Sequence, residues 1–294
     1  MSWLEILRLR AVRRKFLMNG AMIALHLALA IGLYLLAWPT KGLGTAALTG
    51  FAAFFLLITI LQVVVPPMSI IRKVQRWPVT RRELSPIYWD AAQRAAERLN
   101  IDVPGLFEFD IPGAAALSWD FALARGIGVE RALTSGSIGS QPVLEAIVAH
   151  ECAHLKTSDT SWSLIAQNCA GLAFLFADFL AAFGAVRLVF FHGGLLEFVW
   201  IGCGFAVFLY RRLLYWRLWM RMLHLHEFSC DALAAEVIGS PSQAAAALLL
   251  LELRAENIRL MRRMAGLEAP EPEGRVFRTH PPVEERVAAL LAKR

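Results

Sequence analysis

The chain has 294 residues, of which 57% are hydrophobic and only 18% are charged, and its formal net charge is +6. This composition is too apolar for an ordinary soluble domain of that length, so it favours an integral membrane protein. The positive charge indicates membrane topology and attraction to anionic lipid headgroups. We do not expect nucleic acid as a partner, because no basic stripe is interleaved with aromatic residues.

Four apolar segments are long enough to cross a hydrocarbon core, which takes about 20 residues. They are residues 16–38, 46–65, 163–186 and 195–210. Basic residues gather before the first segment and after the second and fourth, whereas the two short connections carry only Lys41 and Arg187. By the positive-inside rule, both termini and the large polar parts face the cytoplasm. The first segment lacks a small-residue cleavage site, so we expect an uncleaved anchor.

Two acidic residues lie within or near these segments. Ionisable groups inside a bilayer are costly unless they find a partner. We therefore expect Asp178 to face the helix bundle with a partner such as Asn168. For the same reason we expect Glu197 to lie at the membrane edge near Arg187.

The polar stretch between the second and third segments has the features of half a compact domain. Ser85 and Pro86 open a helix with an apolar stripe, and Asn100 ends it. Short apolar runs follow, separated by turn residues at 112–113 and 125–126. This alternation of runs and turns predicts a small antiparallel sheet.

Residues 150–154 have the sequence His-Glu-Cys-Ala-His in a segment with helical periodicity. His150 and His154 are one helical turn apart on the same face, so their imidazoles can hold a zinc ion. Glu151 is turned about a quarter of the way round, where it can serve as a general base toward a water on the metal. Cys152 points to roughly the opposite side.

A catalytic zinc takes three protein ligands and keeps one position for water, so a third ligand must come from elsewhere. The best candidate is Glu227. Asp231 lies one turn further along the same helix face, where it can accept the free ring N–H of a ligating histidine. His224, His226 and Cys230 are also able to bind zinc and remain rivals.

The order of these motifs resembles that of the membrane-embedded zinc metallopeptidases of the HtpX and CAAX prenyl protease family, M48, especially its bacterial HtpX-like branch with four spans. The matching features are H-E-x-x-H, two intervening membrane segments, Glu227-x-x-x-Asp231 followed by Ala232-Leu-Ala-Ala, and Thr279-His-Pro-Pro-Val-Glu-Glu-Arg286. The resemblance implies a mainly α-helical membrane protein with four transmembrane helices and a cytoplasmic gluzincin-type α+β protease domain.

In this arrangement we expect four parts along the chain. Residues 1–67 form a basic segment and a membrane hairpin, and residues 68–162 form the first catalytic half. Residues 163–210 form a second hairpin, and residues 211–294 form the second catalytic half.

The resemblance also implies roles for individual residues. One Zn²⁺ per chain is held by His150, His154 and Glu227, with Glu151 as the base. Two acidic residues, Asp231 and Asp159, lie behind these ligands. His280 stabilises the oxyanion, although a helix-capping or loop histidine is an equally good interpretation of that residue.

The strand before the motif helix departs from the family pattern. Where the family has an Asn-Ala-Phe segment, this chain has Gly113-Ala-Ala-Ala-Leu-Ser118, which puts the family's substrate-pocket shape in question here. We expect an extended substrate to bind by strand addition along an edge formed by Ala114, Ala115, Ala116, Leu117 and Ser118.

The function implied is that of a zinc metalloendopeptidase of a bacterial inner membrane. Its partners are the lipid bilayer and protein or peptide substrates, in particular membrane proteins undergoing quality control. One alternative is a sensor-transducer metalloprotease that cleaves a specific regulator, although such a protein ordinarily has an extracytoplasmic domain. The other is a non-catalytic zinc-binding scaffold, which would have no need of Glu151.

Overall fold

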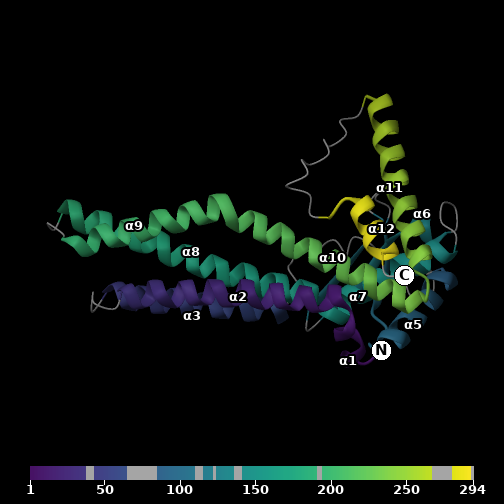
Figure 1. Ribbon diagram of the computed structural model, residues 1–294, viewed down its shortest axis with the longest axis horizontal. Coiled ribbons are helices and arrows are strands. Elements are labelled where there is room, and N and C mark those ends of the chain that lie inside the picture. The colour runs from purple at the N-terminus through teal and green to yellow at the C-terminus, as the bar shows by residue number, and fades with distance from the viewer. Residues whose placement is uncertain are drawn as a thin grey trace. The chain divides into compact units, whose positions relative to one another are not determined.

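The computed structural model describes residues 1–37, 43–64, 85–109, 115–121, 124–135, 141–190, 194–266 and 280–292. These residues are mainly helical, and the chain divides into two compact units whose α-helices are labelled in Figure 1. Unit 1 comprises Met1–Lys15, Val65–Thr160 and Leu223–Arg294, and unit 2 comprises Phe16–Val64 and Ser161–Met222. Each unit is therefore assembled from segments that are far apart in the sequence.

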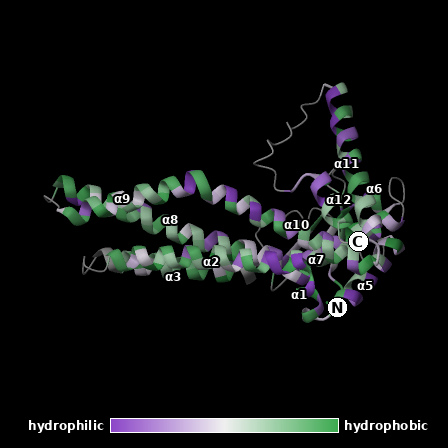
Figure 2. Cartoon of the chain, in the orientation of Figure 1, coloured by the Kyte–Doolittle hydropathy of each residue, from purple (hydrophilic) through white to green (hydrophobic). Residues whose placement is uncertain are grey.

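Unit 2 is built from long apolar helices. They belong to α2 (Arg10–Ala37), α3 (Leu43–Val64), α8 (Asp159–Phe190), α9 (Leu195–Tyr210), a π-helical turn η2 (Arg211–Tyr215) and the start of α10 (Trp216–Ile238). Three described helices are long and apolar enough to cross a membrane: Arg10–Ala37, Asp159–Phe190 and the continuous Leu195–Ile238. The second expected span is a shorter apolar helix over Ala46–Gln62. Hydrophobic residues predominate along α3 and α9 (Figure 2).

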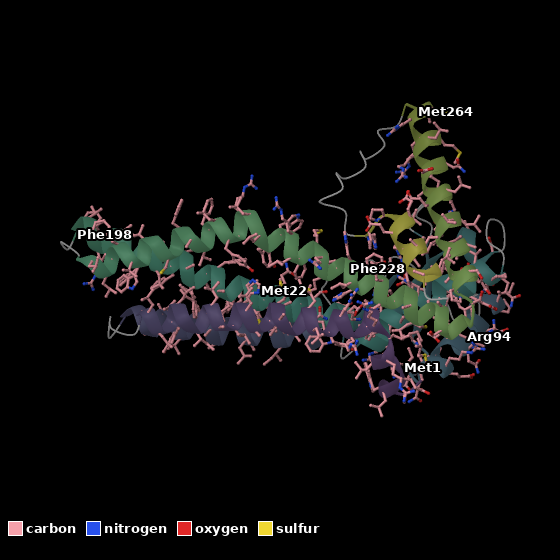
Figure 3. All side chains as sticks on the ribbon, in the orientation of Figure 1. Met1, Met22, Arg94, Phe198, Phe228 and Met264 are labelled. Carbon is pink, nitrogen blue, oxygen red and sulfur yellow. The ribbon has the colours of Figure 1, made fainter. Side chains whose placement is uncertain are left out.

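Helices α2, α3, α8 and α9 share one buried core. Trp200 of α9 is fully buried, and its indole N–H donates to the carbonyl of Leu36 in α2 at 3.3 Å. Some apolar side chains, such as Phe54 of α3 and Phe198 of α9, are more than half exposed. Phe198 is labelled in Figure 3. A buried apolar core beneath an apolar surface is the pattern of helices that contact lipid.

Of the two partners predicted for acidic residues in unit 2, one is confirmed and one is wrong. Nε of Arg187 lies 2.8 Å from Oε1 of Glu197, as predicted. The partner predicted for Asp178 was wrong, because Asn168 donates to Gln62 at 2.7 Å and the Asp178 side chain is exposed. Asn168 and Asp178 lie on one helix, where ten residues correspond to about 15 Å of rise, so their side chains cannot meet.

Unit 1 contains the remaining elements. They are α1 (Trp3–Arg8), α5 (Pro86–Leu99), α6 (Arg131–Thr134), α7 (Gln141–Thr157), α11 (Pro241–Met264), α12 (Val283–Leu291) and three strands, together with the C-terminal part of α10. The helix α5 begins at the predicted proline and ends at Asn100, which adopts a left-handed conformation with φ of 52°. The motif helix α7 packs against α5, α11 and the sheet.

The strands β1 (Gly105–Phe109), β2 (Ala116–Phe121) and β3 (Ala124–Glu130) form a sheet in the order β1-β3-β2. The prediction of an antiparallel sheet was wrong, because β1 pairs with β3 in parallel while β2 pairs with β3 antiparallel. Ile127 and Val129 of β3 are fully buried, which suits β3 to the central position. Alternation of apolar residues specifies the buried face of a strand but not its neighbours.

β2 is consequently an edge strand. Ala116, Leu117 and Ser118 are its first three residues, Ala115 directly precedes it, and Ala114 is outside the described residues. The described part of the expected edge segment therefore lies next to β3. The carbonyl of Ala115 accepts a hydrogen bond from the Glu130 N–H of β3 at 2.8 Å.

Candidate metal centre and active site

Three side chains from two helices of unit 1 meet at one point. The helix α7 places His150 and His154 on one face, with their Nε2 atoms 3.1 Å apart. The helix α10 contributes Glu227, whose Oε2 lies 3.5 Å from Nε2 of His150 and whose Oε1 lies 3.6 Å from Nε2 of His154. The structure therefore brings together the three residues that the sequence suggested as ligands.

These separations fit a metal ion between the three side chains. Ligand bonds of about 2.0–2.1 Å around a tetrahedral zinc place the ligand atoms about 3.3–3.4 Å apart. Two imidazoles and one carboxylate are a donor set that catalytic zinc prefers. Among the described residues, Oε2 of Glu227 is buried and makes no aligned hydrogen bond, although Nη1 of Arg286 lies 3.1 Å from it.

Two buried carboxylates lie behind the histidines. Nδ1 of His154 is hydrogen-bonded to Oδ2 of Asp159 at 2.8 Å. Nδ1 of His150 lies 3.0 Å from Oδ1 of Asp231, close to it but not aligned as a hydrogen bond. Carboxylates in these places hold each ring so that its Nε2 faces the other ligands.

The electrostatics of the site bear on how it would take up a metal. Burial disfavours the charged form of His150, but the Asp231 and Glu227 carboxylates outweigh it and raise the pKa of His150 to about 10. In the metal-free protein this histidine is therefore protonated at neutral pH. Metal binding must displace that proton, because only the neutral ring is a ligand.

One residue of the site was not predicted. Arg286 of α12 donates two hydrogen bonds to Asp231, from Nε at 2.7 Å and from Nη2 at 2.6 Å. Its Nη1 lies 3.1 Å from Oε2 of Glu227. Arg286 stands at the end of the Thr279–Arg286 motif, but no spacing rule relates it to a carboxylate on another helix.

A cavity of about 310 Å³ is lined by two of the candidate ligands, His150 and Glu227. Glu151 lines it, as does His280, whose Nδ1 lies 3.2 Å from Oε2 of Glu227 and whose side chain is 68% exposed. Ala115 and Ala116 of the edge strand form part of its wall. The candidate base, the candidate ligands His150 and Glu227, His280 and the start of the edge strand thus share one cavity.

The rival ligands lie close to the same region. Cys230 forms a second possible group with His154 and Asp159, and its thiol donates to Oδ2 of Asp159 at 3.4 Å. His226 is buried, with Nδ1 4.0 Å from Oδ2 of Asp159. Among the described residues, His224 is in neither of the two groups of possible metal ligands.

Cys152, which the sequence placed on the far side of the helix, is fully buried. Burial raises the pKa of its thiol to about 12, so the thiol stays protonated. A protonated buried thiol does not compete for a metal.

Residues 93–294 match peptidase family M48. The chain is 30% identical over 262 residues to a protease HtpX homolog from Acaryochloris marina, covering 85% of this chain and 83% of that protein. It is 29% identical to one from Nostoc sp., with 85% of both chains covered. In fold it is similar to the crystal structure of S. mikatae Ste24p, with a TM-score of 0.59 and 16% identity over 94% of this chain and 66% of that one. The chain therefore belongs to peptidase family M48, and it is a membrane metallopeptidase.

Proposed function

We propose that the protein is a zinc-dependent endopeptidase of a bacterial inner membrane, with one zinc ion held by His150, His154 and Glu227. The observation that carries this proposal is the convergence of the Nε2 atoms of His150 and His154 with the two carboxylate oxygens of Glu227, at distances of 3.1–3.6 Å. Glu151 lines the same cavity as His150 and Glu227. A scaffold that only stored zinc would need the ligands but not an adjacent carboxylate base.

Each residue has a separate task in this mechanism. Zinc, when bound, would supply a Lewis acid that polarises the scissile carbonyl and lowers the pKa of a water molecule. Glu151 accepts the proton of the attacking water and passes it to the leaving amide nitrogen. His280 donates a hydrogen bond to the oxyanion that develops on the carbonyl.

The edge strand β2 would align the substrate. The Glu130 N–H donates to the carbonyl of Ala115, next to the paired residues Ala116 and Val129 of β2 and β3. Hydrogen-bonded and non-hydrogen-bonded pairs alternate in an antiparallel ladder, so the N–H groups of Ala116 and Ser118 face the open edge. An extended polypeptide can add to this edge through its main chain.

The substrate class we propose is apolar polypeptide, including segments of membrane proteins. Much of the cavity wall beyond the ligands is apolar, for example Ile147, Leu248 and Leu251. The helix α11, one wall of the cavity, also carries a stripe of exposed apolar residues within about 120° of arc. The stripe consists of Leu249, Leu250, Leu253, Leu260, Met261 and Met264. Of these residues, Met264 is labelled in Figure 3. Leucine and methionine without β-branching suit a surface that accepts varied apolar sequences.

We further propose that unit 1 and both termini lie in the cytoplasm, as the basic flanks of the apolar segments indicate. A reporter fused at Gly266, directly after α11, is expected to signal the cytoplasm. A periplasmic signal at that position would overturn the proposed orientation.

The enzymatic proposal is tested with full-length protein purified in detergent with a chelator present, then supplied with zinc and a loosely folded substrate. The parent is expected to cleave it. Glu151→Gln is expected to bind zinc as the parent does but to cleave about 10²–10⁴-fold more slowly, the usual contribution of a general base. Glu145→Gln, on the surface of the same helix, serves as the matched control. Unchanged cleavage by Glu151→Gln, or a zinc-loaded parent without activity, would contradict the proposal.

A further inference from the structure

Lys15 is the last residue of unit 1 before the first apolar segment, and its side chain is fully buried. Its neighbours Arg13 and Arg14 are exposed, as expected of a basic membrane flank. A lysine is almost never fully buried unless its charge is paired. Lys15 therefore has a task other than topology.

The partner of Lys15 is Asp159, one of the two carboxylates behind the candidate metal ligands. The Lys15 ammonium group donates to Oδ1 of Asp159, which also accepts from Oγ1 of Thr157 at 3.0 Å. The other oxygen, Oδ2, accepts from Nδ1 of His154 at 2.8 Å. One carboxylate thus bridges a buried ammonium group and the ring of His154.

The N-terminal segment that carries Lys15 is docked on unit 1. The N-terminal amine of Met1 donates to the carbonyl of Arg98 at the end of α5. Nζ of Lys156 lies 5.0 Å from the centre of the Trp3 ring, within the range of a cation–π contact. Ile6 and Val12 are fully buried. The segment that carries Lys15 is therefore packed against the rest of unit 1.

We propose that Lys15 is a positioning residue for the metal site. Its ammonium group holds the Asp159 carboxylate so that Oδ2 accepts the Nδ1–H of His154, and this hydrogen bond directs Nε2 of His154 toward His150 and Glu227. Without Lys15, the carboxylate is free to turn toward the Cys230 thiol, which already lies 3.4 Å from Oδ2. The inference rests on the proposed function, because it takes His154 as a ligand.

Zinc affinity and the visible absorption of the Co²⁺-substituted protein test this proposal, using the full-length chain in detergent. Lys15→Met is expected to weaken zinc binding about 10–100-fold, the usual cost of losing a group that orients a ligand, and to change the Co²⁺ spectrum. Lys15→Arg keeps the charge and should recover most of the affinity. Arg14→Met removes an exposed neighbour and should match the parent. Parental zinc affinity and an unchanged Co²⁺ spectrum in Lys15→Met would overturn the proposal.

A double variant guards against a simple loss of folding. Asp159→Asn removes the carboxylate through which Lys15 acts, so Lys15→Met added to it should cause no further loss of zinc affinity. A further loss of several-fold or more would show that Lys15 acts by another route and would overturn the proposal. These measurements do not depend on turnover. A parent that binds zinc without cleaving would refute the proposed function, whereas the role of Lys15 would still be decided by the zinc affinities.

Discussion

Arg286 binds Asp231 through two parallel hydrogen bonds of 2.6 and 2.7 Å, which ties α12 to the helix that carries Glu227. The same guanidinium group lies 3.1 Å from Glu227, and both carboxylates are buried. Two buried acids this close repel one another unless a cation besides the protonated His150 lies beside both. Arg286 supplies that cation in a geometry that lysine cannot reproduce.

Replacing Arg286 by methionine should therefore weaken both the fold around the site and its affinity for zinc. The variant leaves Asp231 and Glu227 without their guanidinium partner, which costs roughly 3–5 kcal/mol for a buried pair. We expect a lower melting temperature and about 10–100-fold weaker zinc binding. Arg286→Lys should have a melting temperature and a zinc affinity between those of Arg286→Met and the parent. Glu285→Gln, an exposed change on the same helix, should match the parent. Parental stability and zinc affinity in Arg286→Met would show that the pair is dispensable.

Ser118→Pro is expected to impair substrate alignment without disturbing the metal. Proline removes the Ser118 N–H, which faces the open edge of β2, while the bonds to β3 remain. One main-chain hydrogen bond is worth about 1 kcal/mol, so kcat/KM for an extended peptide should fall about fivefold. Ser118→Ala keeps the N–H and should be unaffected. Equal kcat/KM for both variants would argue against strand addition at this edge.

In unit 2, Gly204 allows α9 to approach α8 closely. A Cβ atom there would lie 2.4 Å from Cβ of Ala181 and 3.0 Å from the carbonyl oxygen of Ala177. Gly204→Ala should therefore destabilise the helix pair by about 1–3 kcal/mol, the usual cost of overpacking. Gly202→Ala adds a methyl group into open space on the same helix and is the control. Similar melting temperatures for the two variants would contradict this packing.

The metal-free protein should lose stability as the pH rises. The pKa of His150 is about 10 in the folded protein and about 6.5 in the unfolded chain, so the stabilisation is complete below about pH 6.5 and disappears toward pH 10. Its melting temperature is expected to fall over that range, and His150→Ala should show a smaller decrease. Zinc binding at about pH 8 should release about one proton from His150, measurable by calorimetry in buffers of different ionisation enthalpy. A melting temperature that does not change with pH would contradict the assigned charge.

Local spacing was the most informative part of the sequence. The four-residue separation predicted that His150 and His154 share a helix face, and their Nε2 atoms do face one another. The start of α5 at Pro86 and its end at Asn100 were likewise predicted, because proline and the left-handed end residue act locally. The hydroxyl cap predicted for Ser85 was wrong, because its side chain makes no capping hydrogen bond. Periodicity also indicated the edge-strand segment but not the mixed pairing of the sheet, since strand order depends on contacts with distant segments.

Long-range ion pairs were not predictable in the same way. Lys15 and Asp159 are 144 residues apart, and Arg286 and Asp231 are 55 apart. Lys15 was indistinguishable in sequence from the exposed arginines beside it, and its burial is a property of the folded unit. The error over Asp178 had a related cause, because the partner of Asn168 is Gln62, on a different helix.

The identity of the atoms around the metal tests the central claim most directly. X-ray absorption at the zinc edge of the zinc-loaded Glu151→Gln protein is expected to show only nitrogen and oxygen neighbours at about 2.0–2.1 Å, from His150, His154, Glu227 and water. A sulfur neighbour at about 2.3 Å would place the metal instead in the group of His154, Asp159 and Cys230, and would contradict the site proposed here.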